Sequence, residues 1–154
     1  MGRRTVICRH HAMEVVQIQL NKGEKIPLHD HTDMTIFCQI NYGKCRLKSY
    51  DFVGFKDGKK VLRLVQDRIV QTGDHCSITP SHCNFHEFEA LENTQFTDVL
   101  TPPYEVADTT MHWYRLEKIA GTTHDYIAHV ISEEEITLPF AVEYEHEEAF
   151  AMAG

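Results

Sequence analysis

Residues 23–43 read GEKIPLHDHTDMTIFCQINYG and contain two histidines, His29 and His31, that are separated by one residue. In an extended chain, side chains at positions i and i+2 point to the same face. His29 and His31 therefore present two imidazoles side by side, and Asp30 points to the opposite face. Because imidazole is the commonest protein ligand of metals, this pair is a candidate half of a metal site. A content of 11 histidines in 154 residues supports that interpretation.

Short segments of alternating apolar and polar residues follow one another along the chain and predict an all-β protein. Glycine and asparagine turns separate these segments, and Asp57-Gly58 is a typical hairpin signal. The predicted strands cover 13–20, 34–40, 45–52, 61–70, 75–79, 84–90, 94–100 and 112–119. Only the acidic end from Ser132 has helical character. We expect a single domain over 1–154, with a barrel over about residues 5–131 and an acidic C-terminal segment over 132–154.

Composition narrows the classes of function. A formal net charge of -8 argues against general nucleic-acid binding, because phosphate contacts need clustered lysine and arginine. No apolar segment is long enough to span a membrane, and the N-terminus lacks the apolar region of a signal peptide. The odd number of cysteines, without a C-x-x-C pair, predicts free thiols in a reducing compartment, either cytoplasmic or nuclear. Nothing in the sequence demands a partner, so we expect a monomer.

The spacing around the histidine pair extends to glycines on both sides. Gly23, five residues, His29, one residue and His31 are followed by four residues, Ile36, six residues and Gly43. This resembles the first motif of the cupin superfamily, G-x5-H-x-H-x(3,4)-E-x6-G. The resemblance implies an all-β cupin double-stranded β-helix, or jelly-roll barrel, with the two glycines in turns at the ends of a hairpin.

The match departs from the cupin pattern at Ile36, which stands where a glutamate ligand is usual. A looser second motif includes Gly73, Pro80 and SHCNFH, which supplies His86. Three neutral imidazoles leave a divalent iron its full charge and open positions, which favours anionic ligands such as a thiolate with dioxygen beside it.

Four longer motifs strengthen the resemblance. IPLHDHTDMTIF, GKCRLKSYDF, NFHEFEA and FTDVLTPPY occur in this order over about residues 23–115. They resemble the motifs of the cysteamine dioxygenases and plant cysteine oxidases, a family of cupins. That resemblance implies a non-haem Fe(II) enzyme that adds both atoms of O2 to the sulfur of a 2-aminothiol. The expected substrate is cysteamine or the N-terminal cysteine of a peptide, and the product is a sulfinic acid.

The resemblance also assigns the site residues one by one. His29, His31 and His86 match the three iron-binding histidines, and Asp98 and Tyr104 match positions that line the site. The Asp98 carboxylate is expected to pair with the ammonium group of the substrate. The Tyr104 hydroxyl is expected to donate to a bound oxygen species or to orient the thiol. Two ordinary alternatives remain open, namely Asp98 as a strand terminator and Tyr104 as a packing residue.

Some positions depart from the family pattern. Thr32 and Asp33 replace a proline and a small residue, and His82 and Cys83 stand where two glycines are frequent. His112 replaces a cysteine, so the cysteine–tyrosine crosslink of some members cannot form there. We expect His82 to lie close enough to the site to change its shape or charge. This sequence begins just before the barrel, without the helical N-terminal extension of many members, and on that basis we expect an accessible mouth and a peptide substrate.

Two other functions remain open. One is a different cupin enzyme that uses manganese, zinc or nickel on a sugar or keto acid, and the other is a metal- or ligand-binding module without turnover.

Apolar residues of the predicted strands are expected in the core rather than in a pocket. They are Ile36, Phe37, Phe85, Phe88, Phe96 and Val99.

Overall fold

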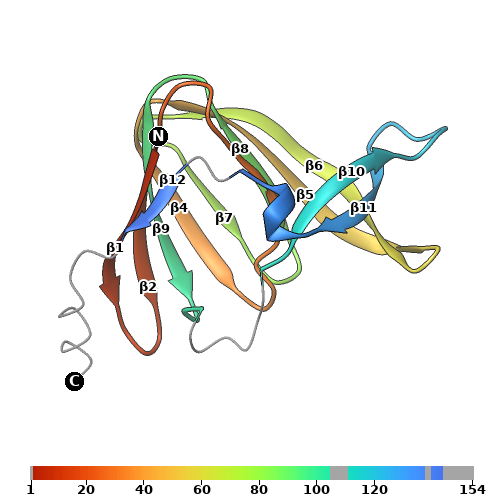
Figure 1. Ribbon diagram of the computed structural model, residues 1–154, viewed down its shortest axis with the longest axis horizontal. Helices are drawn as coiled ribbons and strands as arrows, with labels where there is room; N and C mark the ends of the chain where they lie inside the picture. Colours follow the sequence, from red (N-terminus) through yellow and green to blue (C-terminus); the bar gives the residue numbers. More distant parts are fainter. Residues whose placement is uncertain (1, 105–110, 138–139, 144–154) are drawn as a thin grey trace.

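The computed structural model describes residues 2–104, 111–137 and 140–143, the last segment by its backbone alone. Most of these residues lie in strands (Figure 1). The strands are β1 (Gly2–Arg9), β2 (Glu14–Leu20), β3 (Lys25–His29), β4 (Thr35–Tyr42), β5 (Lys44–Lys56), β6 (Lys59–Gln71), β7 (His75–Ile78), β8 (Phe85–Ala90), β9 (Thr94–Thr101), β10 (Trp113–Lys118), β11 (Asp125–Ile131) and β12 (Phe140–Glu143). The all-β prediction is confirmed.

The strands form two six-stranded sheets. The first has the order β12-β1-β2-β9-β4-β7, and the second, β10-β11-β6-β5-β8-β3, closes on itself. The closing contact pairs Trp113 of β10 with His29 of β3. In Figure 1 the far ends of the β5–β6 and β10–β11 hairpins project away from the first sheet. The second sheet therefore carries a histidine at the point where its edges meet.

The β5–β6 hairpin is longer than its sequence pattern predicted. Its turn is at Asp57 and Gly58, whose φ angles of 51° and 75° suit a type I′ turn and the twist of the two strands. The exposed apolar residues near the turn break the alternation that predicted the shorter strands, and Phe55 is 69% exposed. Long backbone pairing therefore continues where the side-chain pattern ends.

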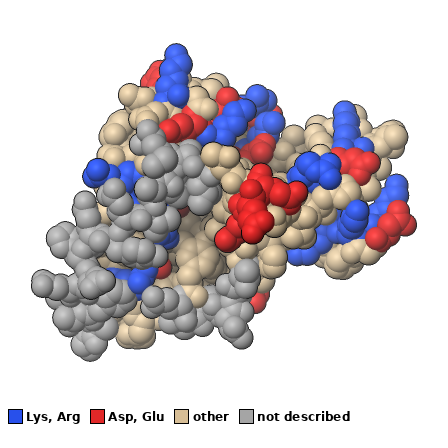
Figure 2. Space-filling view, viewed as in Figure 1, with Lys and Arg blue, Asp and Glu red and all other residues tan. Residues whose placement is uncertain are grey.

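The helical character expected from Ser132 is limited. Within 111–137 it amounts to one 3-10 turn, η1 (Glu133–Glu135), capped by Ser132. Three exposed glutamates make an acidic patch there, visible over η1 in Figure 2. Farther on, β12 pairs in parallel with β1, and residues 144–154 of the expected acidic segment lie outside the described residues.

The main core fills the space between the two sheets. Its buried members come from strands of both sheets and include Val16, Ile18, Ile36, Ile40, Leu47, Phe88, Phe96 and Leu100. A second buried cluster lies within the closed sheet and contains Leu28, Tyr50, Leu62, Phe85, Tyr114 and Ala128. Phe37 was expected in the core, but its side chain is 45% exposed, so that expectation is wrong. The alternation of β4 turns Phe37 outward and its neighbours Ile36 and Cys38 inward.

The two motif glycines occupy turns, as the cupin pattern implied. Gly23 has a φ angle of 89° and Gly43 one of 94°, in the region that favours glycine. A Cβ atom on Gly43 would collide with the backbone of Asn93 and Thr94. The chain that carries the histidine pair is thus held between two sharp turns.

All five cysteines are free thiols. Over the described part of the chain, no helix has the length and apolarity needed to cross a membrane.

Candidate metal centre

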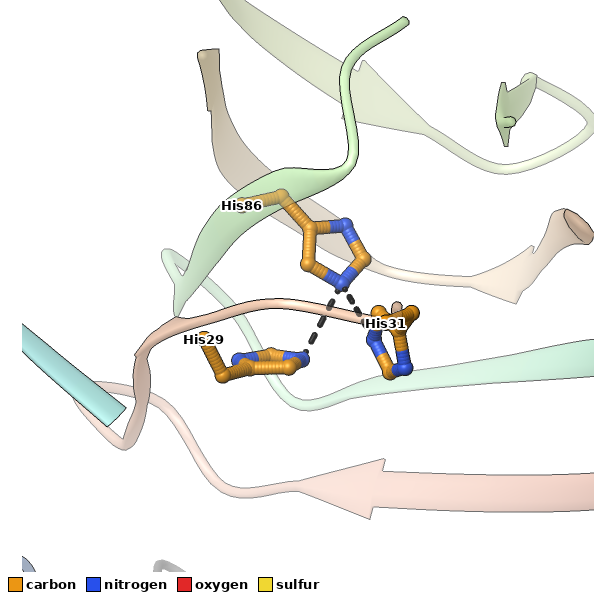
Figure 3. A group of neighbouring side chains, drawn as sticks. All are labelled: His29, His31 and His86. Carbon is orange, nitrogen blue, oxygen red and sulfur yellow. Dashed lines mark hydrogen bonds between the residues drawn. The ribbon is translucent and has the colours of Figure 1, made fainter. Parts of the chain in front are cut away.

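Three imidazoles converge between the sheets (Figure 3). His29 is the last residue of β3 and pairs across the ladder with His86 of β8, and His31 follows two residues later. The Nε2 atom of His86 lies 3.0 Å from Nε2 of His29 and 3.0 Å from Nε2 of His31. All three side chains are buried. The structure therefore brings together the three histidines that the motifs selected.

These separations fit a single metal ion. An ion about 2.1 Å from each of two nitrogens that are 3.0 Å apart sees them at about 90°. Such an angle belongs to an octahedral corner, in which three imidazoles occupy one face. Among the described residues, the donor atoms that cluster here come from His29, His31 and His86, with no carboxylate in the group. A metal site of three neutral ligands is what this donor set suggests.

The outer nitrogens of two rings fix their tautomers. Nδ1 of His29 lies 2.7 Å from the Pro27 carbonyl oxygen and must donate to it, because a carbonyl only accepts. Nδ1 of His31 lies 2.6 Å from Tyr104 Oη, whose hydroxyl is in turn 3.8 Å from Met111 Sδ. If the tyrosine donates to sulfur, it accepts from His31. Both Nε2 atoms then keep their lone pairs for a metal.

Burial keeps the triad neutral. It lowers the pKa of His29 to about 4 and lowers the pKa values of His31 and His86 well below the usual range. Repulsion from neighbouring rings lowers the pKa values of His31 and His86 further, and Arg4 adds to the effect on His31, whereas Pro27 and Asp30 partly offset the effect of burial on His29. Neutral imidazole is the form that binds metals, so the environment prepares the ligands near pH 7.

Asp30 points away from the triad, as the strand pattern predicted, and holds the histidine segment against β10. Its carboxylate accepts hydrogen bonds from the His112 backbone N–H at 2.8 Å and from the Tyr114 hydroxyl at 2.8 Å. The side chain is 1% exposed. Because Asp30 lies between His29 and His31, these contacts position both histidines.

Asn84 supports the segment from the other side. Its Oδ1 accepts from the His31 backbone N–H at 2.9 Å, and its Nδ2 donates to the His31 carbonyl at 2.8 Å and to the Thr79 carbonyl at 3.0 Å. Asn84 belongs to the NFHEFEA motif, from which no role for it was predicted. Its three contacts connect the loop before β8 to the histidine segment.

A cavity of about 370 Å³ lies beside the triad, between the two sheets. Its walls include Val16, Ile18, Phe88 and Phe96, so the two phenylalanines expected only in the core also face the cavity. Ile36 is buried in the core and does not appear among the lining residues.

One wall of the cavity is charged, which was not predicted from the sequence. Glu14, which is 1% exposed, lies 3.2 Å from an Arg9 nitrogen and 3.7 Å from an Arg4 nitrogen. Glu14 Oε2, Asp98 Oδ1 and Trp113 Nε1 line the cavity and are buried without a hydrogen-bond partner within the described chain. Buried polar atoms are normally satisfied, so this set is suited to a polar ligand.

Asp98 and Tyr104 both reach the cavity. Burial raises the pKa of Asp98 to about 6, and a hydrogen bond with Cys38 partly offsets the effect. Burial also raises the pKa of Tyr104 well above its ordinary value, so the phenol keeps its proton. The Tyr104 hydroxyl contacts Nδ1 of His31, so in this structure it orients one ring of the triad.

The residues that differ from the family pattern lie at different positions in the structure. Asp33 and Cys83 adopt φ angles of 58° and 55°, where small residues or glycine fit more easily. His112 lies against Asp30. His82 contacts Asp51 at 3.2 Å and is absent from the cavity wall, so its expected influence on the pocket is not direct.

Comparison with known protein families gives a match over nearly the whole chain. The family model PCO_ADO matches residues 3–153. The chain belongs to the PCO_ADO family. This confirms the resemblance found in the motifs.

The chain is similar to curated proteins with two kinds of name. Human 2-aminoethanethiol dioxygenase is 26% identical over 123 residues, which cover 63% of this chain and 46% of that protein. Plant cysteine oxidase 1 from Arabidopsis thaliana is 35% identical over 85 residues, which cover 51% of this chain and 29% of the plant protein. The chain thus spans less than half the length of these two relatives.

Solved structures support the cupin fold of this PCO_ADO chain. KdgF from a Halomonas species matches with a TM-score of 0.52 at 16% identity, over 66% of this chain and 79% of that structure. An RmlC-like cupin from Desulfovibrio desulfuricans matches with a TM-score of 0.50 at 14% identity, over 65% of this chain and 81% of that structure. The predicted cupin fold is confirmed.

Replacing Tyr104 with phenylalanine should weaken metal binding. The change leaves Nδ1–H of His31 without its acceptor, and loss of an outer hydrogen bond to a ligand typically costs about 10- to 100-fold in metal affinity or activity. Anaerobic titration with ferrous ion measures the effect. Tyr42→Phe, at a tyrosine that is 45% exposed, is the control. Equal affinity in Tyr104→Phe and the wild type would contradict the positioning role.

Proposed function

We propose that this protein is a non-haem iron(II) thiol dioxygenase that converts a 2-aminothiol to a sulfinic acid. The substrate is cysteamine or a peptide with an N-terminal cysteine, and the reaction adds both atoms of O2 to sulfur: R–SH + O2 gives R–SO2H. The equation balances without a further reductant. The single observation that carries the proposal is the buried cluster of three neutral imidazoles, without a carboxylate among the described donors, beside a polar cavity.

The residues present fit iron. Imidazole is a suitable ligand for iron, and the family names point to oxidation of thiols by dioxygen. His29, His31 and His86 would hold the ion through their Nε2 atoms. A bound ferrous ion supplies positions at which a thiolate and dioxygen meet.

The remaining residues bind and orient the substrate. Asp98 offers a carboxylate on the cavity wall, where the ammonium group of a 2-aminothiol gains a charge-assisted contact. Tyr104 holds the ring of His31, and the apolar walls limit the access of water. The orphan Oε2 of Glu14 offers a second acceptor on the same charged wall.

The proposal includes a monomer in a reducing compartment, either cytoplasmic or nuclear, that binds no nucleic acid and no membrane. The five free thiols and the net charge of -8 support these assignments.

The test is a side-by-side assay with cysteamine, cysteine and peptides that begin with cysteine. We expect oxygen consumption that requires added iron(II), and a product that has gained two oxygen atoms by mass spectrometry. Matched peptides that begin with serine are the control. Fully iron-loaded protein that forms no sulfinate from any of these thiols would refute the activity.

Asp98→Asn should lower kcat/KM for cysteamine by about 10- to 100-fold, because hydrogen bonds to charged groups contribute about 1.5–3 kcal/mol. The pKa of Asp98 is raised to about 6, so the wild-type carboxylate becomes protonated as pH falls through that value and kcat/KM should fall with it. A cation at the triad lowers this pKa, which places the acid limb at or below pH 6. A pH profile of kcat/KM measures both effects, with Asp57→Asn as the control at an exposed aspartate. An identical acid limb in Asp98→Asn would contradict the assignment.

A further inference from the structure

A second group of metal-ligand residues lies at the loop between β7 and β8. It consists of Asp51 on β5 together with His82 and Cys83, and each contributes one donor atom within 4.8 Å of the others. None of the three lines the cavity beside the triad. The proposed thiol oxidation uses none of them.

The contacts hold the donors in place. Oδ2 of Asp51 lies 3.2 Å from Nδ1 of His82, and Oδ1 of Asp51 accepts from the Cys83 backbone N–H at 2.6 Å. The second contact fixes the carboxylate against the turn while Oδ2 faces the imidazole. The Cys83 side chain is buried, whereas that of His82 is 66% exposed, so the group opens to solvent on one side.

Cysteine is an unusual residue for the backbone conformation at position 83. Its φ angle of 55° lies in the left-handed region, where glycine costs least. The residue before Cys83 is His82. Here both positions carry metal-ligand side chains, and the fold places a carboxylate against them. A strained backbone at such a position calls for a functional explanation.

The donor set indicates the kind of ion. One thiolate, one imidazole and one carboxylate oxygen are ligands of zinc, and a tetrahedral ion with bonds of about 2.0–2.2 Å separates nitrogen and oxygen ligands by about 3.3 Å. The observed 3.2 Å between His82 and Asp51 fits that value. A fourth position would be left for water, since the His82 side chain is 66% exposed. Binding would release the Cys83 proton, since the thiolate is the ligand.

We propose that Asp51, His82 and Cys83 form a second metal site that binds a divalent cation of the zinc class. The site adjoins Asn84, whose side chain holds the backbone of His31 at 2.9 and 2.8 Å. A cation there links β5 to the loop that carries this clamp. It therefore stabilises the segment that positions a triad histidine, without being part of the triad.

Cobalt(II) is the probe, because a thiolate bound to cobalt gives a charge-transfer absorption that three imidazoles cannot give. Titration of metal-free full-length protein should show two equivalents of Co2+ per chain and one thiolate band. Cys83→Ser should lose the band and one equivalent. His86→Ala should lose the other equivalent and keep the band. Cys8→Ser, which removes a partly exposed thiol elsewhere, is the matched control and should change neither.

Two further variants protect the test against misfolding. His82→Ala alters an exposed side chain and should weaken Zn2+ binding at this site at least tenfold. Asp51→Asn removes the carboxylate charge and should also weaken Zn2+ binding, but its amide keeps an oxygen that can accept from the Cys83 N–H and so preserves the turn. Zn2+ should also raise the melting temperature of His86→Ala, and this rise should disappear when His82→Ala is added. No thiolate band in the wild type, or a band that persists in Cys83→Ser, would overturn the proposal. A single Co2+ equivalent whose thiolate band disappears in Cys83→Ser would keep this site and place the failure at the triad. These readouts do not involve sulfinate formation, so they are independent of the proposed function.

Discussion

His86→Ala is expected to reduce ferrous ion binding by at least about 100-fold and to remove sulfinate formation. Loss of an outer contact to a metal ligand already costs about 10- to 100-fold, and this change removes a ligand itself. His86 is also central to the triad, because its Nε2 atom lies 3.0 Å from the Nε2 atoms of both His29 and His31. The remaining pair would offer two donors in place of three.

Iron content after anaerobic reconstitution and sulfinate yield from cysteamine measure the effect. His124→Ala makes the same substitution at an exposed histidine and should behave as the wild type. Circular dichroism separates loss of metal from loss of fold. A folded His86→Ala protein that keeps stoichiometric iron and full turnover would show that the triad is not the metal centre.

Asp30→Ala should lower the free energy of unfolding by about 3 kcal/mol or more. The carboxylate accepts from the His112 backbone N–H and the Tyr114 hydroxyl, and alanine leaves both donors buried without a partner. Each unsatisfied buried group costs about 1–3 kcal/mol. Urea denaturation of the metal-free protein measures the loss, and an unchanged m-value shows that stability rather than compactness has changed.

Asp30→Asn is the matched variant, since its amide keeps one acceptor oxygen. It should lose about half as much stability as Asp30→Ala. Iron binding should weaken in both variants, because Asp30 lies between His29 and His31 and its contacts hold that segment against β10. An Asp30→Ala protein as stable as the wild type would contradict the role assigned to these hydrogen bonds.

The triad and most strands could be predicted because their signals are local. The H-x-H spacing and its flanking glycines lie within 23–43, and alternation over a few residues marks strands such as β2 and β9. His86 needed the family resemblance, since one histidine in a strand has no pattern of its own. The residues that support the triad were less visible. Asp30 meets His112 across 82 positions and Asn84 meets His31 across 53, so no short window contains either contact.

The charged wall was missed for a different reason. Arg4 and Arg9 belong to β1, where charged residues interrupt the apolar alternation, and the prediction began its first strand at residue 13. Glu14 occupies a buried position of β2, where the alternation of apolar and polar residues predicts an apolar side chain. β3 was missed because it is short and contains Pro27. In each case packing between the sheets overrides the local pattern.

A crystal structure of the protein loaded anaerobically with iron(II) tests the metal centre most directly. We expect one ion about 2.1 Å from each Nε2 atom of His29, His31 and His86, with no protein carboxylate bound to it. The His86 atom should remain close to its present 3.0 Å from the other two. Iron at a different site, or a ligand sphere completed by a carboxylate such as Asp98 or Glu14, would contradict the account.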